Sequence, residues 1–283
     1  MPELPEVETT RRGITPHAIG RTVAALAVHD SRLRWPIPAN LPSKLVGLTL
    51  ARLDRRSKYL LFRFHGPADD RSDRAGTLLV HLGMTGSLRW YSAASAVPPR
   101  RLHDHVDLTF DNGAVLRYHD PRRFGAILWV DDPVDEHRLL ARLGPEPFGQ
   151  DFNASALREK LRTRSAAIKL ALMDNHVVVG VGNIYANEAL FHAGIHPGRA
   201  ANQISLRRLE RLVESVRSTL SAAIAKGGST LRDYLDSAGA PGYFQLDYQV
   251  YGRVGLACRR CGTALKGLRQ GGRATTYCPR CQK

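Results

Sequence analysis

The clearest hydrophobic pattern in this chain is a helical stripe over residues 205–226. Apolar side chains recur there every three or four residues, at Leu206, Leu209, Val213, Val216, Leu220 and Ile224. This spacing places them on one face of an α-helix. Ser205 is a suitable N-cap residue, and Gly227-Gly228 ends the pattern. Shorter helices are predicted at residues 5–19, 154–164, 165–173 and 183–193.

Between about residue 20 and residue 131 the pattern changes to short apolar runs bounded by turn residues. The predicted strands are residues 22–28, 45–53, 59–64, 77–82, 106–110 and 114–118. Asp111-Asn112-Gly113 separates the last two and favours a hairpin turn. Frequent short strands without intervening helices favour an antiparallel sandwich or barrel. Residues 66–76 and 92–101 have the composition of loops, and no function is predicted for the first of them.

A change of texture near residue 132 marks a predicted domain boundary. Residues 1–131 form a β-rich domain that begins with a helix, and residues 132–240 form a helical domain. A Gly/Pro-rich stretch then leads into a cysteine-bearing tail, residues 241–283. This order predicts a two-domain α+β chain with an appended tail.

The charge balance is strongly basic, with 41 Lys and Arg against 26 Asp and Glu and a formal net charge of +15. Such an excess favours a polyanionic partner, and nucleic acid is the first candidate. A generally cationic protein, for example one associated with ribosomes, is the alternative. No apolar run approaches the roughly 18 residues of a membrane helix, and Glu3, Glu6 and Glu8 oppose a signal peptide. We therefore expect a cytoplasmic protein without a membrane partner, and no feature predicts anything other than a monomer.

All four cysteines lie in the last 26 residues, as the pairs Cys258/Cys261 and Cys278/Cys281, which are 16 residues apart. This spacing predicts a zinc site, because two Cys-x2-Cys turns can bring four thiolates into a tetrahedron. Four protein ligands leave no open position, so one structural zinc ion per chain is expected. Disulfide bonds are the alternative, but nothing in the sequence suggests secretion.

The segment after Asp247 contains no acidic residue and eight basic ones. They are Arg253, Arg259, Arg260, Lys266, Arg269, Arg273, Arg280 and Lys283. A zinc-stabilised hairpin with only positive charges favours a surface that faces phosphate groups. A solvated hairpin without a partner is the alternative.

A series of motifs extends along nearly the whole chain, beginning with Met1-Pro2-Glu3-Leu4-Pro5-Glu6. The others are Lys58-Tyr59-Leu60-Leu61, His81-Leu82-Gly83-Met84-Thr85-Gly86, Asp120-Pro121-Arg122-Arg123-Phe124-Gly125, Leu172-Met173-Asp174-Asn175, Gly180-Val181-Gly182-Asn183-Ile184-Tyr185 and Pro241-Gly242-Tyr243-Phe244. With the zinc tail, this ordered set resembles the formamidopyrimidine-DNA glycosylases, bacterial enzymes that excise oxidised purines from double-stranded DNA. The resemblance implies an N-terminal antiparallel β-sandwich, a helix–two-turn–helix domain and a four-cysteine zinc-finger hairpin.

The resemblance also implies that Pro2 is the nucleophile, freed as a secondary amine when Met1 is removed. Its attack on the sugar C1′ expels the damaged base and leaves an iminium ion, which cannot become a neutral imine. The iminium acidifies the C2′ proton, so β- and then δ-elimination cut the strand. Glu3 is the implied acid/base at the sugar ring oxygen, and Glu6 is a supporting carboxylate. Lys58 is the implied cation that lowers the amine pKa and holds a flanking phosphate.

Three further residues match those that the family uses to fill the gap left by an everted base, namely Met84, Arg122 and Phe124. Met and Phe can wedge between bases, and a guanidinium can hydrogen-bond the orphaned partner base. The alternative is that the Met and the Phe are ordinary core residues.

The glycine-rich segment 180–183 precedes a predicted helix and fits a phosphate-binding hairpin. It fails the dinucleotide fingerprint, because Tyr185 stands in place of the third glycine. Residues 227–234 fall where the family has a lesion-recognition loop. By resemblance, DNA contacts are expected from His81, Lys169, Asn183 and Arg273. Lys169 is expected to reach the damaged base, and the alternative for His81 is support of the Gly83–Gly86 turn.

Other clusters of titratable residues are not expected to bind metal. Glu188, His192 and His196 have i, i+4, i+8 spacing, but Gly194 and Pro197 interrupt the helix that would align them. Structural or surface roles are expected for His103, His105 and His119.

Two rival functions are weighed against this prediction. The endonuclease VIII branch shares the fold and the nucleophile but prefers oxidised pyrimidines; Leu4, where that branch typically has glycine, and the Arg122/Phe124 pair favour the purine-specific branch. A zinc-ribbon DNA-binding protein without catalysis would have the same charge and cysteines, but it would not need Pro2-Glu3 at its terminus.

Overall fold

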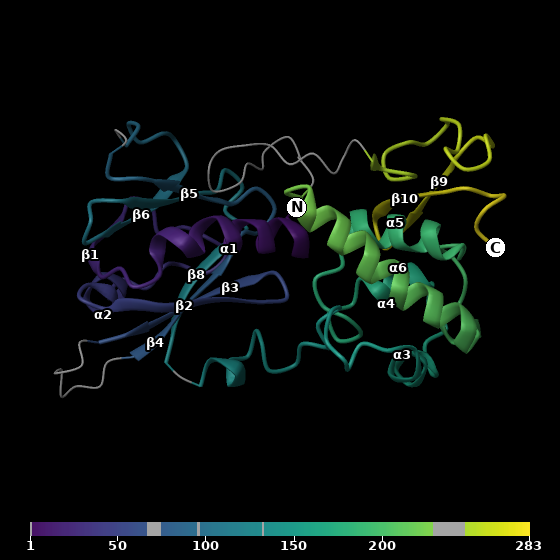
Figure 1. Ribbon diagram of the computed structural model, residues 1–283, viewed down its shortest axis with the longest axis horizontal. Coiled ribbons are helices and arrows are strands. Elements are labelled where there is room, and N and C mark those ends of the chain that lie inside the picture. The colour runs from purple at the N-terminus through teal and green to yellow at the C-terminus, as the bar shows by residue number, and fades with distance from the viewer. Residues whose placement is uncertain (1, 67–74, 95–96, 132, 229–246) are drawn as a thin grey trace. The chain divides into compact units, whose positions relative to one another are not determined.

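The computed structural model describes residues 2–66, 75–94, 97–131, 133–228 and 247–283 (Figure 1). These residues form two compact units. The first contains the described residues up to 141 together with Gly227 and Gly228, and the second contains residues 142–226 and 247–283. The predicted boundaries near residues 132 and 240 and most of the predicted loop 66–76 lie outside the described residues, so the boundaries stay predictions.

The first unit opens with helix α1 (Leu4–Ala18), one residue displaced at each end from the predicted helix 5–19. Its apolar face is fully buried and comprises Leu4, Val7, Ile14 and Ala18. This face packs against strands β2 and β3 of the β-sandwich described below. The helix therefore has a fixed position on the sheet. Residues 2 and 3 lie immediately before its first turn.

Two four-stranded antiparallel sheets form the body of this unit (Figure 1). The strands of the first, in spatial order, are β1 (Val23–Val28), β6 (Asp104–Phe110), β7 (Val115–His119) and β5 (Ser87–Tyr91). Those of the second are β2 (Thr49–Arg56), β3 (Tyr59–His65), β4 (Ala75–His81) and β8 (Ala126–Val130). Side chains from both sheets, such as Phe62 and Phe110, share one hydrophobic core. The structure therefore confirms the antiparallel sandwich.

The predicted hairpin between β6 and β7 is confirmed. Gly113 has a φ of +78°, which favours glycine, and its N–H donates to Phe110 O at 2.9 Å. The predicted strand 45–53 is partly wrong, because Leu45 ends a short helix, α2 (Leu41–Leu45), and β2 starts only at Thr49. A 3-10 turn, η1 (Val134–Glu136), follows β8.

The second unit is helical. Its elements are α3 (Ala154–Leu161), α4 (Ile168–Leu172), α5 (Asn183–Ala193), the 3-10 turn η2 (Ala201–Gln203) and α6 (Leu206–Ala225). The stripe predicted for α6 is confirmed, since Leu209, Val216 and Leu220 are almost fully buried and the helix packs on α3 and α5. Ser205 occupies the predicted N-cap position, and its hydroxyl makes no capping hydrogen bond there. Within the described ranges, no helix has the length and apolar character needed to span a bilayer.

The cysteine-bearing tail of this unit contains the antiparallel hairpin of β9 (Lys266–Gln270) and β10 (Arg273–Tyr277). Two side chains of α5 hold the tail. The buried Glu188 carboxylate accepts backbone N–H groups of Gln249, Val250 and Tyr251 at 2.8–3.0 Å. Asn187 Oδ1 accepts the Thr276 N–H at 2.8 Å. Glu188 is therefore an anchor for the tail.

Candidate active site

The start of α1 brings two buried carboxylates next to Pro2. Pro2 itself is buried, Glu3 is 2% exposed and Glu6 is 0% exposed. Glu3 is the N-cap residue, and its backbone N–H donates to Glu6 Oε2 at 2.8 Å as part of a capping box. Pro5 is tolerated in the first helical turn because its missing N–H has no partner there. The amide groups at this helix end favour the negative charges.

Lys58 lies in the turn before β3, close to His81 at the end of β4. Lys58 is 9% exposed and immediately precedes Tyr59, which pairs with His81 across β3 and β4; the two rings are 4.8 Å apart. Burial first, and then the charges of Lys58 and Arg34, lower the pKa of His81 to about 4. His81 is therefore neutral at pH 7. Its Nδ1 accepts the Gly83 N–H at 3.0 Å, so Nε2 carries the ring proton. The structure supports a role in the turn, and a DNA contact stays a prediction.

Met84, Arg122 and Phe124 lie on two neighbouring turns at the surface of the first unit. Phe124 is 47% exposed, so the interpretation as a core residue is wrong for it. The guanidinium carbon of Arg122 lies 4.9 Å from the centre of the Phe124 ring. Met84 and Phe124 both line a cavity of about 550 Å³, together with Arg34 and His81. The structure thus brings the three predicted wedge residues together.

Asp120 locks these two turns to each other. Its buried carboxylate accepts the Thr85 hydroxyl at 2.6 Å through Oδ1 and the Gly125 N–H at 2.8 Å through Oδ2. The Thr85 hydroxyl oxygen in turn accepts the Arg122 N–H at 3.2 Å. The turns are so close that a Cβ on Gly83 would lie 2.4 Å from Gly125 N. Sequence reasoning missed this residue, whose one signal was its place at the start of the 120–125 motif.

Replacing Asp120 by asparagine is expected to lower the free energy of unfolding by about 1–3 kcal/mol, because an amide nitrogen would leave Thr85 or Gly125 unpaired. Thermal unfolding measures this effect. The same substitution at Asp111, whose side chain is 44% exposed, is the matched control and should change little. Equal losses of stability in the two variants would count against the lock.

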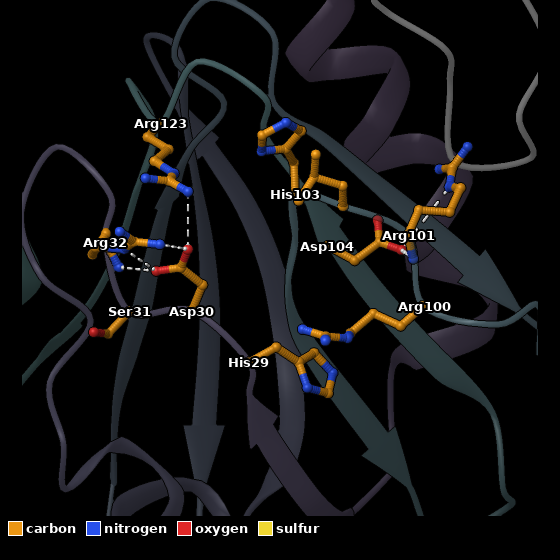
Figure 2. A pocket seen from close by; sticks show the side chains of 10 residues that line it. His29, Asp30, Ser31, Arg32, Arg100, Arg101, His103, Asp104 and Arg123 are labelled. Atoms are coloured by element: carbon orange, nitrogen blue, oxygen red, sulfur yellow. Dashed lines mark hydrogen bonds and ion pairs between the residues drawn. The ribbon is translucent and has the colours of Figure 1, made fainter.

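A second cavity of the first unit, also about 550 Å³, is lined by basic side chains (Figure 2). On one side the Asp30 carboxylate binds Arg32 at 2.9 Å and Arg123 at 3.1 Å. The loop of residues 100–104 supplies Arg100, Arg101 and His103. Among the described residues, the buried atoms His103 Nδ1 and Arg123 Nε have no hydrogen-bond partner. Sequence reasoning gave His103 a structural or surface role and missed the arginines, which no motif marks apart from Arg123.

Lys169 lies in the interior of the second unit. Its side chain is 0% exposed, and its ammonium donates to Asn183 Oδ1 at 2.6 Å, Thr275 Oγ1 at 2.7 Å and Ala274 O at 3.1 Å. The ammonium thus fixes the start of α5 to strand β10. The contact with a damaged base that was expected of Lys169 stays a prediction, and the geometry gives this residue a positioning role.

Asn183 and Arg273 lie near each other. Asn183 begins α5, and its Nδ2 donates to Ala274 O at 3.1 Å. Arg273, the residue before Ala274, is exposed at the start of β10. An exposed guanidinium beside a helix N-terminus is a favourable phosphate site. Lys58 belongs to the first unit, and its expected contact with a flanking phosphate stays a prediction.

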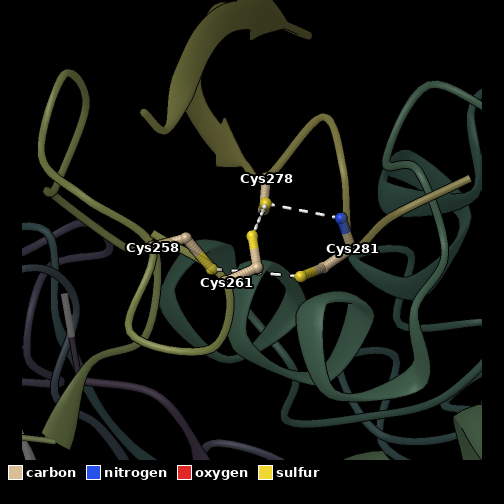
Figure 3. A group of neighbouring side chains, drawn as sticks. All are labelled: Cys258, Cys261, Cys278 and Cys281. Carbon is tan, nitrogen blue, oxygen red and sulfur yellow. Dashed lines mark hydrogen bonds between the residues drawn. The ribbon is translucent and has the colours of Figure 1, made fainter. Parts of the chain in front are cut away.

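The four cysteines converge as the spacing predicts (Figure 3). Their sulfur atoms all lie within 4.8 Å of one another, with 3.5 Å between Cys261 and Cys278 and 4.0 Å between Cys258 and Cys281. These distances match the roughly 3.8 Å edge of a tetrahedron with Zn–S bonds of about 2.3 Å, and they exceed the roughly 2.05 Å of a disulfide. The residues therefore fit one structural zinc ion, and the disulfide alternative is wrong.

Two motifs cannot be placed. The predicted lesion-recognition loop, residues 227–234, lies outside the described residues except for Gly227 and Gly228. The 241–244 motif lies wholly outside them. Gly228 lies close to the carboxylates at the start of α1, because a Cβ on Gly228 would be 3.1 Å from Glu6 Oε1.

Three family models match most of the chain. Residues 1–127 match the formamidopyrimidine-DNA glycosylase N-terminal domain, residues 143–234 the formamidopyrimidine-DNA glycosylase H2TH domain, and residues 255–283 a zinc finger found in FPG and IleRS. The formamidopyrimidine-DNA glycosylases of Thioalkalivibrio sulfidiphilus and Stutzerimonas stutzeri are each 54% identical over 283 residues, with 100% of both chains covered.

Solved structures agree with this assignment. The MutM (Fpg) protein of Thermus thermophilus is 37% identical with a TM-score of 0.85, covering 99% of this chain and 98% of its own. The Lactococcus lactis Fpg in complex with DNA containing an abasic site is 35% identical with a TM-score of 0.87, covering 99% of both chains. A Lactococcus lactis Fpg variant in complex with DNA containing Fapy-dG is 36% identical with a TM-score of 0.88, covering 100% of both chains. With matches along its entire length, this chain belongs to the formamidopyrimidine-DNA glycosylase family.

Proposed function

We propose that this protein excises oxidised purines, 8-oxoguanine and formamidopyrimidines, from duplex DNA and then cleaves the abasic strand. The observation that carries the proposal is the start of α1, where Pro2 stands beside the buried carboxylates of Glu3 and Glu6. It fits the chemistry of related proteins that were solved with abasic-site DNA and with Fapy-dG DNA.

Pro2 acts as a secondary amine once Met1 is removed. The amine lone pair attacks C1′, the C1′–N bond to the base breaks, and the base leaves with the electron pair and takes the proton that the Pro2 nitrogen gives up. Glu3 protonates the ring oxygen as the sugar opens, which leaves an iminium ion on Pro2. The cationic nitrogen withdraws electrons from C1′, so the C2′ proton is lost and the 3′ phosphate departs. A second elimination releases the 5′ phosphate. Glu6 fixes the Glu3 backbone through its 2.8 Å hydrogen bond.

The wedge residues open the duplex for this chemistry. Extruding a base costs a few kcal/mol, roughly, in lost stacking and pairing. Met84 and the exposed Phe124 fill the vacated space, and Arg122 donates hydrogen bonds to the orphaned base. The Asp120 lock holds their turns in place before DNA binds, which reduces the ordering cost on binding.

Phosphate contacts hold the DNA backbone. In the first unit Lys58 binds a phosphate and His81 contacts the DNA. In the second unit Asn183 and Arg273 bind phosphate. The basic cavity of Figure 2 has the charge and size for a further backbone phosphate. Lys169 acts indirectly, since its ammonium orients Asn183 and β10. The zinc ion holds the tail that presents Arg273 and supplies no step of the reaction.

The protein is further proposed to be a cytoplasmic monomer. Its three parts are divided after residues 131 and 240. A single chain carries both the nucleophile and the phosphate-binding residues, so no second copy is needed.

Borohydride trapping on a duplex with 8-oxoguanine opposite cytosine tests the function. Reduction of the iminium should give a covalent complex whose crosslink lies on Pro2, located by mass spectrometry. A complex seen only with thymine glycol would favour the endonuclease VIII alternative. No complex with any oxidised base would leave a zinc-bearing DNA-binding protein without catalysis.

Replacing Arg273 by alanine is expected to weaken DNA binding and to reduce the slope of log affinity against log salt by about 1, the loss of one phosphate contact. Fluorescence anisotropy at several salt concentrations measures both. Arg207→Ala is the matched control, because it removes the same charge from an exposed position on α6. Equal slope changes in the two variants would show that only total charge matters.

A further inference from the structure

Glu8 is a buried carboxylate on α1 that the proposed mechanism does not use. It is 8% exposed and lies five residues after Glu3, or about 7.5 Å along the helix axis. Arg11 donates to it through Nε at 3.0 Å and Nη2 at 2.8 Å, and Arg12 Nε donates at 2.8 Å. Burial raises the pKa of Glu8, but these hydrogen bonds and the charges of Arg11 and Arg55 outweigh burial and lower it to about 2. Glu8 is therefore an anion at any working pH.

Arg55 connects this anion to another part of the fold. It belongs to β2, its side chain is 11% exposed, and its Nε donates to Glu8 Oε2 at 3.2 Å. Its Nη1 donates to Ser57 O at 2.9 Å. Ser57 is 1% exposed and has a φ of +57°, a left-handed conformation that non-glycine residues adopt at a cost. The next residue is Lys58.

We propose that Glu8 and Arg55 are positioning residues for catalysis, an inference that rests on the proposed function. The pair joins the helix that presents Pro2 and Glu3 to the turn that presents Lys58. One guanidinium binds the helix through Glu8 and, at the same time, the carbonyl of the strained residue before Lys58. The pair thereby sets the position of the nucleophile and its acid relative to the phosphate-binding cation.

The geometry distinguishes this role from simple stabilisation. Arg12 binds the same carboxylate, but its side chain is 60% exposed and its bond to Glu8 lies within α1. Removing either arginine is expected to lower the stability of the protein. Of these two arginines, only Arg55 joins α1 to another element, so its removal and not that of Arg12 is expected to shift the helix relative to Lys58. Misplacing a reacting group by about 1 Å can lower a reaction rate up to 10²-fold, so the relative position of these groups has a large effect on the rate.

The test compares Arg55→Met with Arg12→Met, which keep most of the apolar stem of each side chain. Single-turnover excision of 8-oxoguanine from duplex DNA measures the chemical step. Affinity for a duplex with a tetrahydrofuran abasic analogue and the melting temperature are measured in parallel. We expect Arg55→Met to lower the single-turnover rate by about 10- to 100-fold, with affinity within about threefold, and Arg12→Met to keep the rate within about twofold.

Two more variants sharpen the comparison. Glu8→Gln should lose at least as much rate as Arg55→Met, because it weakens the bonds to Arg11 and Arg12 as well as the bond to Arg55. The double variant should lose no more than Glu8→Gln, because that substitution already breaks the link to Arg55. Arg55→Lys should recover only part of the rate, since one ammonium cannot replace the fork that binds both groups.

Each outcome decides between roles. Full recovery with Arg55→Lys would mean that charge alone matters, and equal losses in the Arg55 and Arg12 variants would mean stability alone; both overturn the inference. If the wild type traps on Pro2 while Arg55→Met keeps its full rate, the inference fails and the proposed function stands. If the wild type traps with no oxidised base, the proposed function fails and the inference with it.

Discussion

Replacing Pro2 by glycine is expected to reduce excision of 8-oxoguanine by about three orders of magnitude or more, the scale of disabling a catalytic group. Glycine also exposes an α-amine after Met1 is removed, but its adduct is an iminium ion that still carries an N–H and can lose that proton to become a neutral imine. The permanent positive charge that drives the elimination steps is then missing. The flexible residue also loses the fixed φ that proline brings to the start of α1. Single-turnover excision and borohydride trapping measure the effect.

Glu3→Gln provides the comparison for the same experiment. It should abolish excision because the sugar ring oxygen loses its acid, yet it leaves the Pro2 amine in place. On a preformed abasic site, which already contains some open-chain aldehyde, the glutamine variant should therefore trap better than it excises. An amino-terminal extension that keeps Pro2 internal should remove both activities. Normal excision by the glycine variant would disprove the role given to proline.

Local patterns were sufficient for much of the fold. Helix α1, the β6–β7 hairpin and the stripe of α6 follow from spacing, capping and turn chemistry within a few residues. The failures are also local to particular residues. Strands β5 and β8 were missed, and in the structure they are defined by pairing with β7 and β4, far away in the sequence. Leu45 reads as strand yet ends α2, since packing into the sandwich core overrides its weak propensity.

Some features of the candidate site could likewise be predicted from the sequence, and others could not. The cysteine spacing predicted the metal site, and the resemblance supplied the terminal proline and its neighbouring carboxylates. The contacts that hold the site residues in place were not predictable, because they join distant positions. Thr85 and Asp120 are 35 residues apart, Glu8 and Arg55 are 47 apart, and Lys169 and Thr275 are 106 apart. No periodicity marks such pairs, and only the folded chain brings them together.

Cys261→Ser is expected to unfold the tail, residues 247–283, and to weaken DNA binding by about 100-fold or more. The hydrophobic cluster of the tail is small and counts the cysteines among its members, with Phe191, Val250 and Leu265. It cannot hold the hairpin alone, whereas zinc binding to a structural site of this kind contributes about 10–16 kcal/mol. Without the metal, β10 no longer presents Arg273, and the seven other basic residues of the tail lose their fixed positions.

Removal of zinc by a chelator should reproduce the serine variant, and added zinc should restore binding only to the wild type. Cobalt(II) in place of zinc should give the thiolate-to-metal absorption of a tetrahedral site with four cysteine ligands. The β-sandwich, whose core contains no cysteine, should keep its melting transition in both cases, which separates loss of the tail from general unfolding. Because Glu188 and Asn187 still offer their hydrogen bonds to the tail, binding that survives metal loss would mean that these anchors suffice. The zinc would then not be needed to present Arg273 to the DNA.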